Sequence, residues 1–255
     1  MLAVERRAFI KEAVLEKKSV IVSELSRQFE VTEETIRRDL KVLEAEGVLT
    51  RTYGGAFVQD GVINDVDVSL RETVYVENKR QIAVQCLPLV RNGDSVFLDC
   101  STTALEIAKA LRGMRLTVLT NSMLVANCLA EAEQIRLIVI GGVFQPQNRC
   151  FLGDAALEAL TPYYVDAAFI SCRSLSLEHG VTDSGEESAA VRRKITEQAD
   201  RVYLAADHTK FGKTSFVKIC GFQALTGIVS DQPLPPEWHQ MARKYHLTLL
   251  ENKGT

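Results

Sequence analysis

The chain has 255 residues, of which 46% are hydrophobic and 25% charged, and its formal net charge is −3. This length and composition suit one small domain and one larger domain with a sizeable core. No apolar run approaches the roughly 20 residues that a membrane-spanning helix needs. Charged Glu5, Arg6 and Arg7 at the start of the chain do not suit a secretory signal. We therefore expect a cytoplasmic protein that does not bind a membrane.

The cysteines and histidines predict neither disulfides nor a metal site. The six cysteines are scattered without a CxxC pair: Cys86, Cys100, Cys128, Cys150, Cys172 and Cys220. Because disulfide frameworks and zinc sites need clustered spacings, we expect reduced thiols. The four histidines also lack a ligand spacing, so we assign no metal ion, and no pattern indicates a cofactor.

The first 46 residues predict three helices with short connections. Residues 5–17 and 23–29 have helical composition, and each has an apolar face. Thr32 suits the cap of a third helix, because its hydroxyl can accept a backbone N–H group of the first turn. The apolar residues of this third helix recur at i, i+4 and i+7 and form a buried stripe: Ile36, Leu40 and Leu43.

Gly47 ends the third helix, and residues 48–56 predict a two-stranded wing that turns near a glycine pair. Polar side chains occupy the outward face of the helix and the wing: Thr35, Arg37, Arg38, Lys41, Arg51 and Tyr53. The order of helix, turn, helix and wing is that of a winged helix-turn-helix, whose recognition helix enters the major groove of double-stranded DNA. We expect Arg37 and Arg38 to divide between base edges and phosphates, and the wing to contact the DNA backbone.

The overall charge of this region is not that of a basic DNA binder. Residues 1–60 hold ten Lys or Arg against eleven Asp or Glu, a net charge of −1. On its own, the pair Arg37 and Arg38 would more often be a solvated helix face. The ordered elements around the pair favour DNA binding instead. Because the basic patch is small and local, we expect a homodimer or homotetramer to multiply it.

We assign residues 1–56 to the DNA-binding domain, 57–75 to a polar linker and 76–255 to a second domain. From residue 79 onward, strands and helices alternate. The expected helices cover residues 79–89, 102–111, 122–130, 154–160 and 186–198. The expected strands cover residues 95–99, 116–120, 135–140, 167–171, 201–205, 224–229 and 247–250. Apolar strands separated by helices predict an α/β domain with a mostly parallel sheet covered on both faces.

Polar residues and glycines follow the carboxyl ends of several of these strands: Asp99, Ser101, Thr102, Thr103, Asn121, Gly141, Gly142, Asp207 and Lys210. Ligands of open α/β sheets bind at that edge. Hydroxyls and N–H groups at a helix start suit a phosphate, glycines allow a close approach, and an Asp with a Lys suits hydroxyls and negative charge. This mixture fits a phosphorylated sugar. Singly, each feature has a plainer interpretation as a helix cap, a turn or a surface ion pair.

Two sets of motifs resemble the DeoR family of bacterial transcriptional regulators. One comprises Thr35-Ile36-Arg37-Arg38-Asp39-Leu40 and Tyr53-Gly54-Gly55-Ala56. The other comprises Asp99 with Thr102-Thr103, Thr120-Asn121-Ser122, Gly141-Gly142, and Asp207 with Lys210-Phe211-Gly212. The resemblance implies an effector domain related to ribose-5-phosphate isomerase and coenzyme A transferases, which senses phosphorylated sugars. It assigns the effector role to the polar residues and glycines named above.

The chain departs from the family pattern at three places. Position 101 is Ser where many members have Gly, residues 171–174 replace a commoner glycine-containing turn, and Arg192 stands where Lys is usual. Arg173 is a candidate for a second contact to an anion, and a solvent-facing Arg is an equal alternative.

The sequence therefore predicts a regulator and not an enzyme: a repressor of a sugar-metabolism operon that a phosphorylated sugar releases from its operator. The alternative is a sugar-phosphate isomerase with an accessory DNA-binding domain, in which Asp99, Asp207 or Glu186 would supply the base. No second acid is clearly paired with any of these three carboxylates. Activation is a third hypothesis, because the sequence does not determine the sign of regulation.

Overall fold

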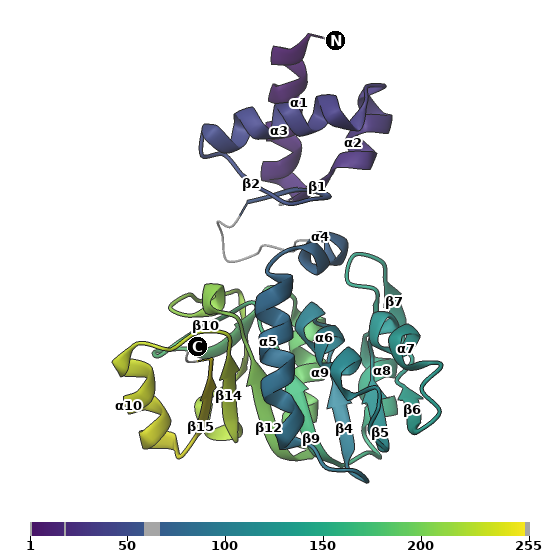
Figure 1. Ribbon diagram of the computed structural model, residues 1–255, viewed down its shortest axis with the longest axis vertical. Helices are drawn as coiled ribbons and strands as arrows, with labels where there is room; N and C mark the ends of the chain where they lie inside the picture. Colours follow the sequence, from purple (N-terminus) through teal and green to yellow (C-terminus); the bar gives the residue numbers. More distant parts are fainter. Residues whose placement is uncertain (1, 18, 59–66, 253–255) are drawn as a thin grey trace. The chain divides into compact units, whose positions relative to one another are not determined.

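The structure is a computed structural model that describes residues 2–17, 19–58 and 67–252. The chain divides into two units, Met1–Val76 and Glu77–Thr255, which are described separately below (Figure 1).

The first unit begins with three helices and a small antiparallel sheet. The helices are α1 (Ala3–Lys17), α2 (Val22–Phe29) and α3 (Glu33–Ala45), and the strands are β1 (Ser19–Ile21), β2 (Thr50–Arg51) and β3 (Gly55–Phe57), in the order β1-β3-β2. Thr32 caps α3, and its hydroxyl oxygen accepts the backbone N–H of Thr35. The predicted stripe of Ile36, Leu40 and Leu43 is buried, and each such side chain stabilises the fold by about 1.5–3 kcal/mol. These elements form the predicted helix-turn-helix and wing.

A fourth helix, α4 (Val68–Thr73), lies in the segment that we expected to be linker. The Asp67 side chain caps this helix, and Leu70 is only 1% exposed because it packs against Phe57 of β3. A Cβ on Gly55 would lie 2.7 Å from Leu70 Cδ2 and 2.1 Å from the Val20 carbonyl oxygen, so only glycine fits there. Two buried side chains in a polar segment give no periodicity that predicts a helix. Residues 59–66 of the expected linker lie outside the described residues.

The second unit is built on a seven-stranded sheet in which every neighbouring pair is parallel. The strand order is β15-β14-β12-β9-β4-β5-β6. The strands are β4 (Ser95–Leu98), β5 (Leu116–Thr120), β6 (Ile135–Val139), β9 (Val165–Ile170), β12 (Ala199–Ala205), β14 (Gly227–Ser230) and β15 (Thr248–Glu251). The predicted parallel sheet is confirmed.

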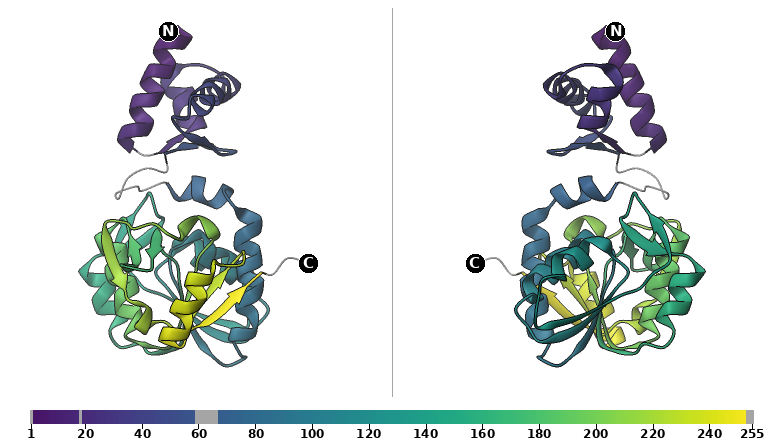
Figure 2. Two further views of the ribbon diagram at one scale, coloured as in Figure 1. Left: turned by 90° about the vertical axis from the view of Figure 1, so that its left-hand side faces the viewer. Right: turned by 90° about the vertical axis from the view of Figure 1, so that its right-hand side faces the viewer.

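Helices cover both faces of this sheet (Figure 2). One face carries α5 (Val76–Cys86), α6 (Thr102–Leu111) and α7 (Met123–Leu129), and the other carries α8 (Asp154–Leu160), α9 (Glu186–Thr196) and α10 (Pro236–Tyr245). Successive strand residues face opposite layers: Val96 and Leu98 join the core under α5, α6 and α7, whereas Phe97 joins the core on the other face. We expected α5 to continue to residue 89, but Pro88 follows it in a 3-10 turn, η1 (Leu87–Leu89).

Short strands beside the main sheet were not predicted. They form a hairpin of β7 (Val143–Gln145) and β8 (Cys150–Leu152), and a small sheet of β10 (Ser174–Ser176), β11 (Gly180–Asp183) and β13 (Val217–Cys220). Helix α10 was not predicted either. Strands of three or four residues are too short to show the period-two alternation on which such predictions depend.

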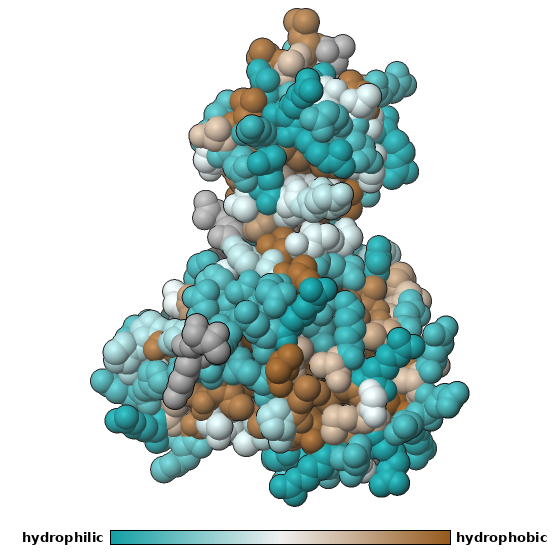
Figure 3. Space-filling view, viewed as in Figure 1, coloured by the Kyte–Doolittle hydropathy of each residue, from teal (hydrophilic) through white to brown (hydrophobic). Residues whose placement is uncertain are grey.

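Within the parts of the chain that the structure describes, no helix combines the length and the apolar character that crossing a membrane requires. On the face seen in Figure 3, hydrophilic residues cover most of the surface of both units.

Candidate DNA interface and effector site

The outward face of α3 carries the arginines that we predicted to contact DNA. Arg37 Nη2 lies 2.6 Å from Glu33 Oε2, and Arg38 Nε lies 3.5 Å from Glu34 Oε1, one helical turn earlier in each case. Lys41 is exposed on the same helix. Ion pairs this exposed contribute little to stability, so phosphates or base edges can replace the carboxylates at little cost. Thr35 has a different local role, because its hydroxyl bonds to the Thr32 hydroxyl at 2.9 Å.

The wing presents a second pair of predicted residues. Arg51 Nε donates to Glu44 Oε2 at 2.7 Å, and the Arg51 backbone N–H donates to Glu44 Oε1 at 2.9 Å. This backbone hydrogen bond, followed by the side-chain one, lowers the pKa of Glu44. Tyr53 lies at the turn of the wing and is 87% exposed. The wing therefore offers a guanidinium held near α3 and an aromatic side chain in solvent.

The acid that follows the two arginines has a structural role that the sequence analysis missed. Asp39 is 3% exposed, and its carboxylate lies 2.6 Å from Arg6 Nε and 3.7 Å from Arg7 Nη1 of α1. This pairing joins α3 to α1 and so fixes the helix that carries the predicted DNA contacts. The sequence offered two signs of this pairing: an acid on the flank of the third helix, and two adjacent basic residues in the first helix.

The predicted effector residues follow neighbouring strands of the main sheet. Asn121 follows β5, Asp99 follows β4, and Asp207 follows β12 just beyond its last residue. Since β5, β4, β9 and β12 are adjacent and parallel, the residues that follow them lie along one edge, where ligands of α/β sheets bind.

Asp99 is the most firmly held of these residues. It is 1% exposed, and its Oδ1 accepts the Ser101 N–H at 2.9 Å. Its Oδ2 accepts the Ser171 N–H at 2.8 Å and Arg192 Nε–H at 2.6 Å. Burial opposes the charge, but Arg192 and these hydrogen bonds outweigh it and hold the pKa of Asp99 below its ordinary value. Both carboxylate oxygens are thus engaged within the protein.

Arg192 therefore has a larger part than the sequence analysis gave it. It extends from α9 into the interior, where it also forms an ion pair with Asp183 of β11. One buried guanidinium thus links two carboxylates, one after β4 and one on the small sheet. The sequence showed Arg192 only as a departure from the family pattern, and Asp183 only as one residue of the motifs that resemble the family.

The start of α6 forms the next part of the site. The Ser101 hydroxyl accepts the Ala104 N–H at 3.0 Å, so Ser101 is the helix cap, as its plainer interpretation had it. Thr102 and Thr103 are buried in the first turn of α6. Asn121 donates from Nδ2 to the Phe151 carbonyl at 3.0 Å, while its buried Oδ1 accepts no hydrogen bond from any described residue. A buried acceptor without a donor is costly and indicates a missing partner.

The two glycines after β6 differ from each other. Gly142 has φ +146°, and a Cβ there would lie 2.6 Å from the Leu152 carbonyl oxygen and 2.9 Å from Ala156 Cβ. Its close approach is therefore to β8 and α8. A Cβ on Gly141 would meet nothing within 4 Å. Of the two glycines that we interpreted as an opening for a ligand, Gly141 is therefore the one with free space beside it.

The loop after β12 gathers charge. Asp207 is 2% exposed, accepts the Thr209 N–H at 3.0 Å, and lies 3.9 Å from Lys210 Nζ. Burial opposes its ionisation, but Lys210, the Thr209 hydrogen bonds and Lys79 together lower the pKa of Asp207. Lys79, at 6% exposure in α5, was not among the predicted site residues. In the sequence, Lys79 was visible only as one lysine at the start of an expected helix, within the motifs that resemble the family.

Arg173 lies three residues beyond the end of β9 and is half-buried. Its backbone N–H donates to the Thr182 carbonyl at 3.1 Å. This backbone contact attaches the run 171–174 to β11, and it leaves the role of the Arg173 side chain a prediction.

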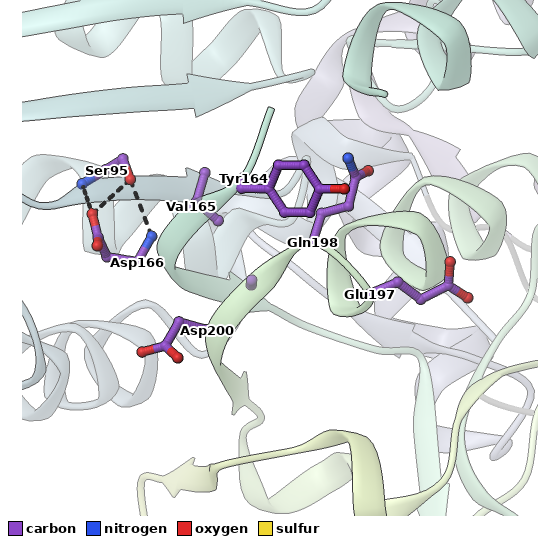
Figure 4. Close-up of a pocket in the computed structure, with 8 residues that line it drawn as sticks. Ser95, Tyr164, Val165, Asp166, Glu197, Gln198 and Asp200 are labelled. Carbon is purple, nitrogen blue, oxygen red and sulfur yellow. Dashed lines mark hydrogen bonds between the residues drawn. The ribbon is translucent and has the colours of Figure 1, made fainter. Parts of the chain in front are cut away.

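A shallow hollow of about 400 Å³ lies at the opposite edge of the main sheet, at the amino ends of β4, β9 and β12 (Figure 4). Ser95 and Asp166 point toward each other there and are joined by hydrogen bonds of 2.6 to 3.0 Å. Gln198 of its lining also has a buried Oε1 that accepts no hydrogen bond from any described residue, but the hollow contains none of the predicted effector residues. We therefore place the candidate site at the carboxyl edge.

A winged helix-turn-helix followed by a parallel α/β unit defines a DNA-binding regulator with a sensor domain. The chain matches the DeoR-like helix-turn-helix domain over residues 6–61 and the DeoR C terminal sensor domain over residues 75–232. It is 39% identical to the uncharacterised HTH-type transcriptional regulator YulB of Bacillus subtilis, over 92% of each chain. The chain belongs to the DeoR family of transcriptional regulators, and it is a regulator and not an enzyme.

Two more distant likenesses were found. The chain is 28% identical to the glycerol-3-phosphate regulon repressor of Escherichia coli, over 98% of this chain and 99% of that one. It also aligns with ribose 5-phosphate isomerase A of Methanocaldococcus jannaschii, with 16% identity and a TM-score of 0.39, over 52% of this chain and 53% of that one.

Proposed function

We propose that this regulator represses a sugar-metabolism operon and that a phosphorylated sugar releases it from the operator. The observation that carries the proposal is that cationic side chains and hydrogen-bond acceptors both lie along one edge of the sheet. Lys210 and Lys79 supply positive charge around buried Asp207, and no described residue donates a hydrogen bond to the Asn121 amide oxygen. Cations suit a phosphate, and carboxylate or amide oxygens suit sugar hydroxyls.

Within this proposal, the effector site comprises the start of α6, the residues after β4, β5, β6 and β9, and the loop after β12: Asp99, Ser101, Thr102, Thr103, Asn121, Gly141, Gly142, Arg173, Asp207 and Lys210. Asp99 shapes the site through the N–H groups that it accepts, since its oxygens are already bonded. The name of the Escherichia coli relative, a glycerol-3-phosphate regulon repressor, supports repression and a link to a phosphorylated metabolite.

The proposed DNA contacts are Thr35, Arg37, Arg38, Lys41, Arg51 and Tyr53. Since one winged helix has few contacts, we propose that a homodimer or homotetramer binds the operator. The effector would favour a conformation in which the paired winged helices no longer match the operator spacing. Linkage then requires operator DNA to weaken effector binding by the same factor.

A thermal-shift panel on the full chain tests the effector class. The panel holds glucose 6-phosphate, fructose 6-phosphate, galactose 6-phosphate and glycerol 3-phosphate, each beside its unphosphorylated parent. A ligand at 100 times its Kd stabilises the folded protein by about 2.7 kcal/mol, which raises Tm by about 5 °C or more. We expect one phosphate to raise Tm and its parent to leave it unchanged.

Lys210→Ala should abolish that shift, because it removes a cation of the proposed site. Lys213→Ala is the matched control, since Lys213 is an exposed lysine in the same loop. Equal shifts in the two variants, or an equal shift with the parent sugar, would show that the phosphate is not bound at this edge.

A further inference from the structure

Asp231 is a buried acid at the same edge of the sheet that neither the sequence nor the proposed site assigns. It follows β14 directly, and its side chain is fully buried. Its Oδ1 accepts the backbone N–H of His208 at 2.7 Å. Its Oδ2 lies 2.7 Å from His208 Nδ1 and accepts a hydrogen bond from Asn78 Nδ2 at 2.6 Å. One carboxylate therefore joins the loop after β12 to helix α5.

The loop that Asp231 holds is the one that contains Asp207 and Lys210. His208 lies between these two residues in the 3-10 turn η2 (His208–Lys210), which Asp207 caps. A ligand that contacts Asp207 or Lys210 therefore acts on the turn whose first N–H is bonded to Asp231.

Asn78 lies in the first turn of α5, which crosses the face of the sheet in front of β12 (Figure 1). A second contact ties the helix to β14 further along, where Gln85 Nε2 donates to the Ser230 carbonyl at 2.9 Å. The two contacts differ, because Gln85 bonds to a backbone group of the sheet while Asn78 bonds to a side chain shared with the loop. Asn78 thus connects α5 to the loop through Asp231, beside the charge interaction of Lys79 with Asp207.

The chain reaches α5 through a short joint from the first unit. Helix α4 ends at Thr73 and α5 begins at Val76, with Tyr75 held at φ +52° between them. Helix α4 is in turn fixed to the wing sheet, since Leu70 packs on Phe57 and the Asp67 N–H donates to Ser19 Oγ at 3.3 Å. Two residues therefore separate a helix attached to the wing from a helix attached to the effector loop.

We propose that Asp231 is a positioning residue that couples the effector loop to the first turn of α5, and through the joint to the DNA-binding unit. This inference rests on the proposed function, because it takes the loop with Asp207 as the sensing site. The carboxylate is fully buried, so water cannot replace a donor that moves away. A shift of the His208 N–H therefore changes the geometry available to Asn78, and the two arrangements form a linked equilibrium.

The experiment uses the full chain and DNA as its only probe. A duplex is obtained by selection from random DNA with the wild-type protein. Hydrogen exchange of the peptide spanning residues 207–211 is then measured with and without this duplex. In the wild type, we expect bound DNA to change the exchange rate about fivefold or more, the lower limit of typical coupling between sites.

Asn78→Ala is the test variant, and Gln81→Ala is its matched control. Both are half-buried amides of α5, and Gln81 accepts a hydrogen bond from Asn252 at 3.0 Å, outside the Asp231 cluster. We expect Asn78→Ala to keep its Tm within about 3 °C of the wild type, to bind the duplex, and to lose the DNA-dependent change in the loop. Gln81→Ala should retain that change.

A DNA-dependent change that persists in Asn78→Ala, or that is missing in the wild type, would overturn the proposal. An equal loss in Gln81→Ala would also overturn it, because the effect would then belong to α5 in general. Failure of the phosphosugar panel has a separate meaning. It would remove the proposed ligand while leaving this measurement intact, because no sugar is used in it.

Discussion

Arginine–carboxylate pairs occur in both units, and burial separates two kinds: the pair of Arg6 with Asp39 in the DNA-binding unit is buried and structural, whereas other pairs are exposed. In the DNA-binding unit, the pairs of Arg37 with Glu33 and Arg51 with Glu44 are partly exposed. In the sensor unit, Arg192 is 6% exposed and links Asp99 to Asp183. The exposed arginines are accessible to the DNA that we propose they contact, whereas the buried guanidinium of Arg192 is enclosed by its carboxylates. Burial, which a residue pattern does not report, decides which arginines are ligand-binding candidates and which hold the fold.

The largest expected effect follows from removing the buried arginine. Arg192→Met should destabilise the protein by about 3–5 kcal/mol, because it leaves two buried carboxylates without their counter-charge. Denaturation in urea measures this loss. Arg112→Met is the control, since Arg112 forms an exposed pair with Glu131 and should change stability by about 0.5 kcal/mol or less. Equal losses in the two variants would contradict the distinction between buried and exposed pairs.

The same cluster predicts a pH dependence with a definite sign. The folded-state pKa of Asp99 is lowered, so its stabilising contribution is complete above the unfolded value of about 3.9. That contribution is lost as the pH falls through the folded value. In Arg192→Met, burial without the guanidinium raises this pKa instead. We therefore expect the stability difference between wild type and variant to be largest near pH 7, to shrink as the pH falls through the raised pKa of the variant, and to be smallest below the lowered pKa of the wild type.

The next largest effect concerns the two glycines after β6. Gly142→Ala should destabilise the fold by about 1–3 kcal/mol, because it adds a Cβ at φ +146° that meets the Leu152 carbonyl oxygen. Gly141→Ala should leave stability nearly unchanged and should weaken binding of the phosphosugar, if a ligand occupies the space beside it. Urea denaturation and the thermal-shift panel measure the two effects. A stable Gly142→Ala would contradict the packing role.

The contrast between local and long-range contacts also explains which features could be predicted from the sequence. Periodicity predicted the stripe of Ile36, Leu40 and Leu43, and strand ends predicted where Asp99, Asn121 and Asp207 lie, because both depend on local patterns. The ties of Arg192 to Asp183 and of Asp231 to Asn78 join residues 9 and 153 positions apart. No local pattern encodes such contacts. The role of Gly142 was missed for the same reason, since its neighbours come from β8 and α8.

A smaller effect is expected at the recognition helix. Arg37→Ala should weaken binding to the selected duplex by about 1–3 kcal/mol, the loss typical of one contact to a base. Stability should change little, because the Glu33 pair is partly exposed. Fluorescence anisotropy at one fixed salt concentration measures the affinity, and Arg112→Ala in the sensor unit is the control. Unchanged affinity for the duplex would contradict the docking of α3 in the major groove.

The smallest effect separates the wing arginine from its carboxylate. Glu44→Gln removes the charge that holds Arg51 at 2.7 Å, so the guanidinium becomes available to a phosphate. We expect tighter DNA binding and a slope of log K against log salt that is steeper by up to about one. Glu46→Gln makes the same change of charge at an exposed position nearby and corrects for the general loss of repulsion. Only an excess of the Glu44 effect over the Glu46 effect can come from Arg51. If Glu44→Gln and Glu46→Gln give the same salt slope, the wing contacts DNA without Arg51. The pair of Arg51 with Glu44 would then be a structural pair in spite of its exposure.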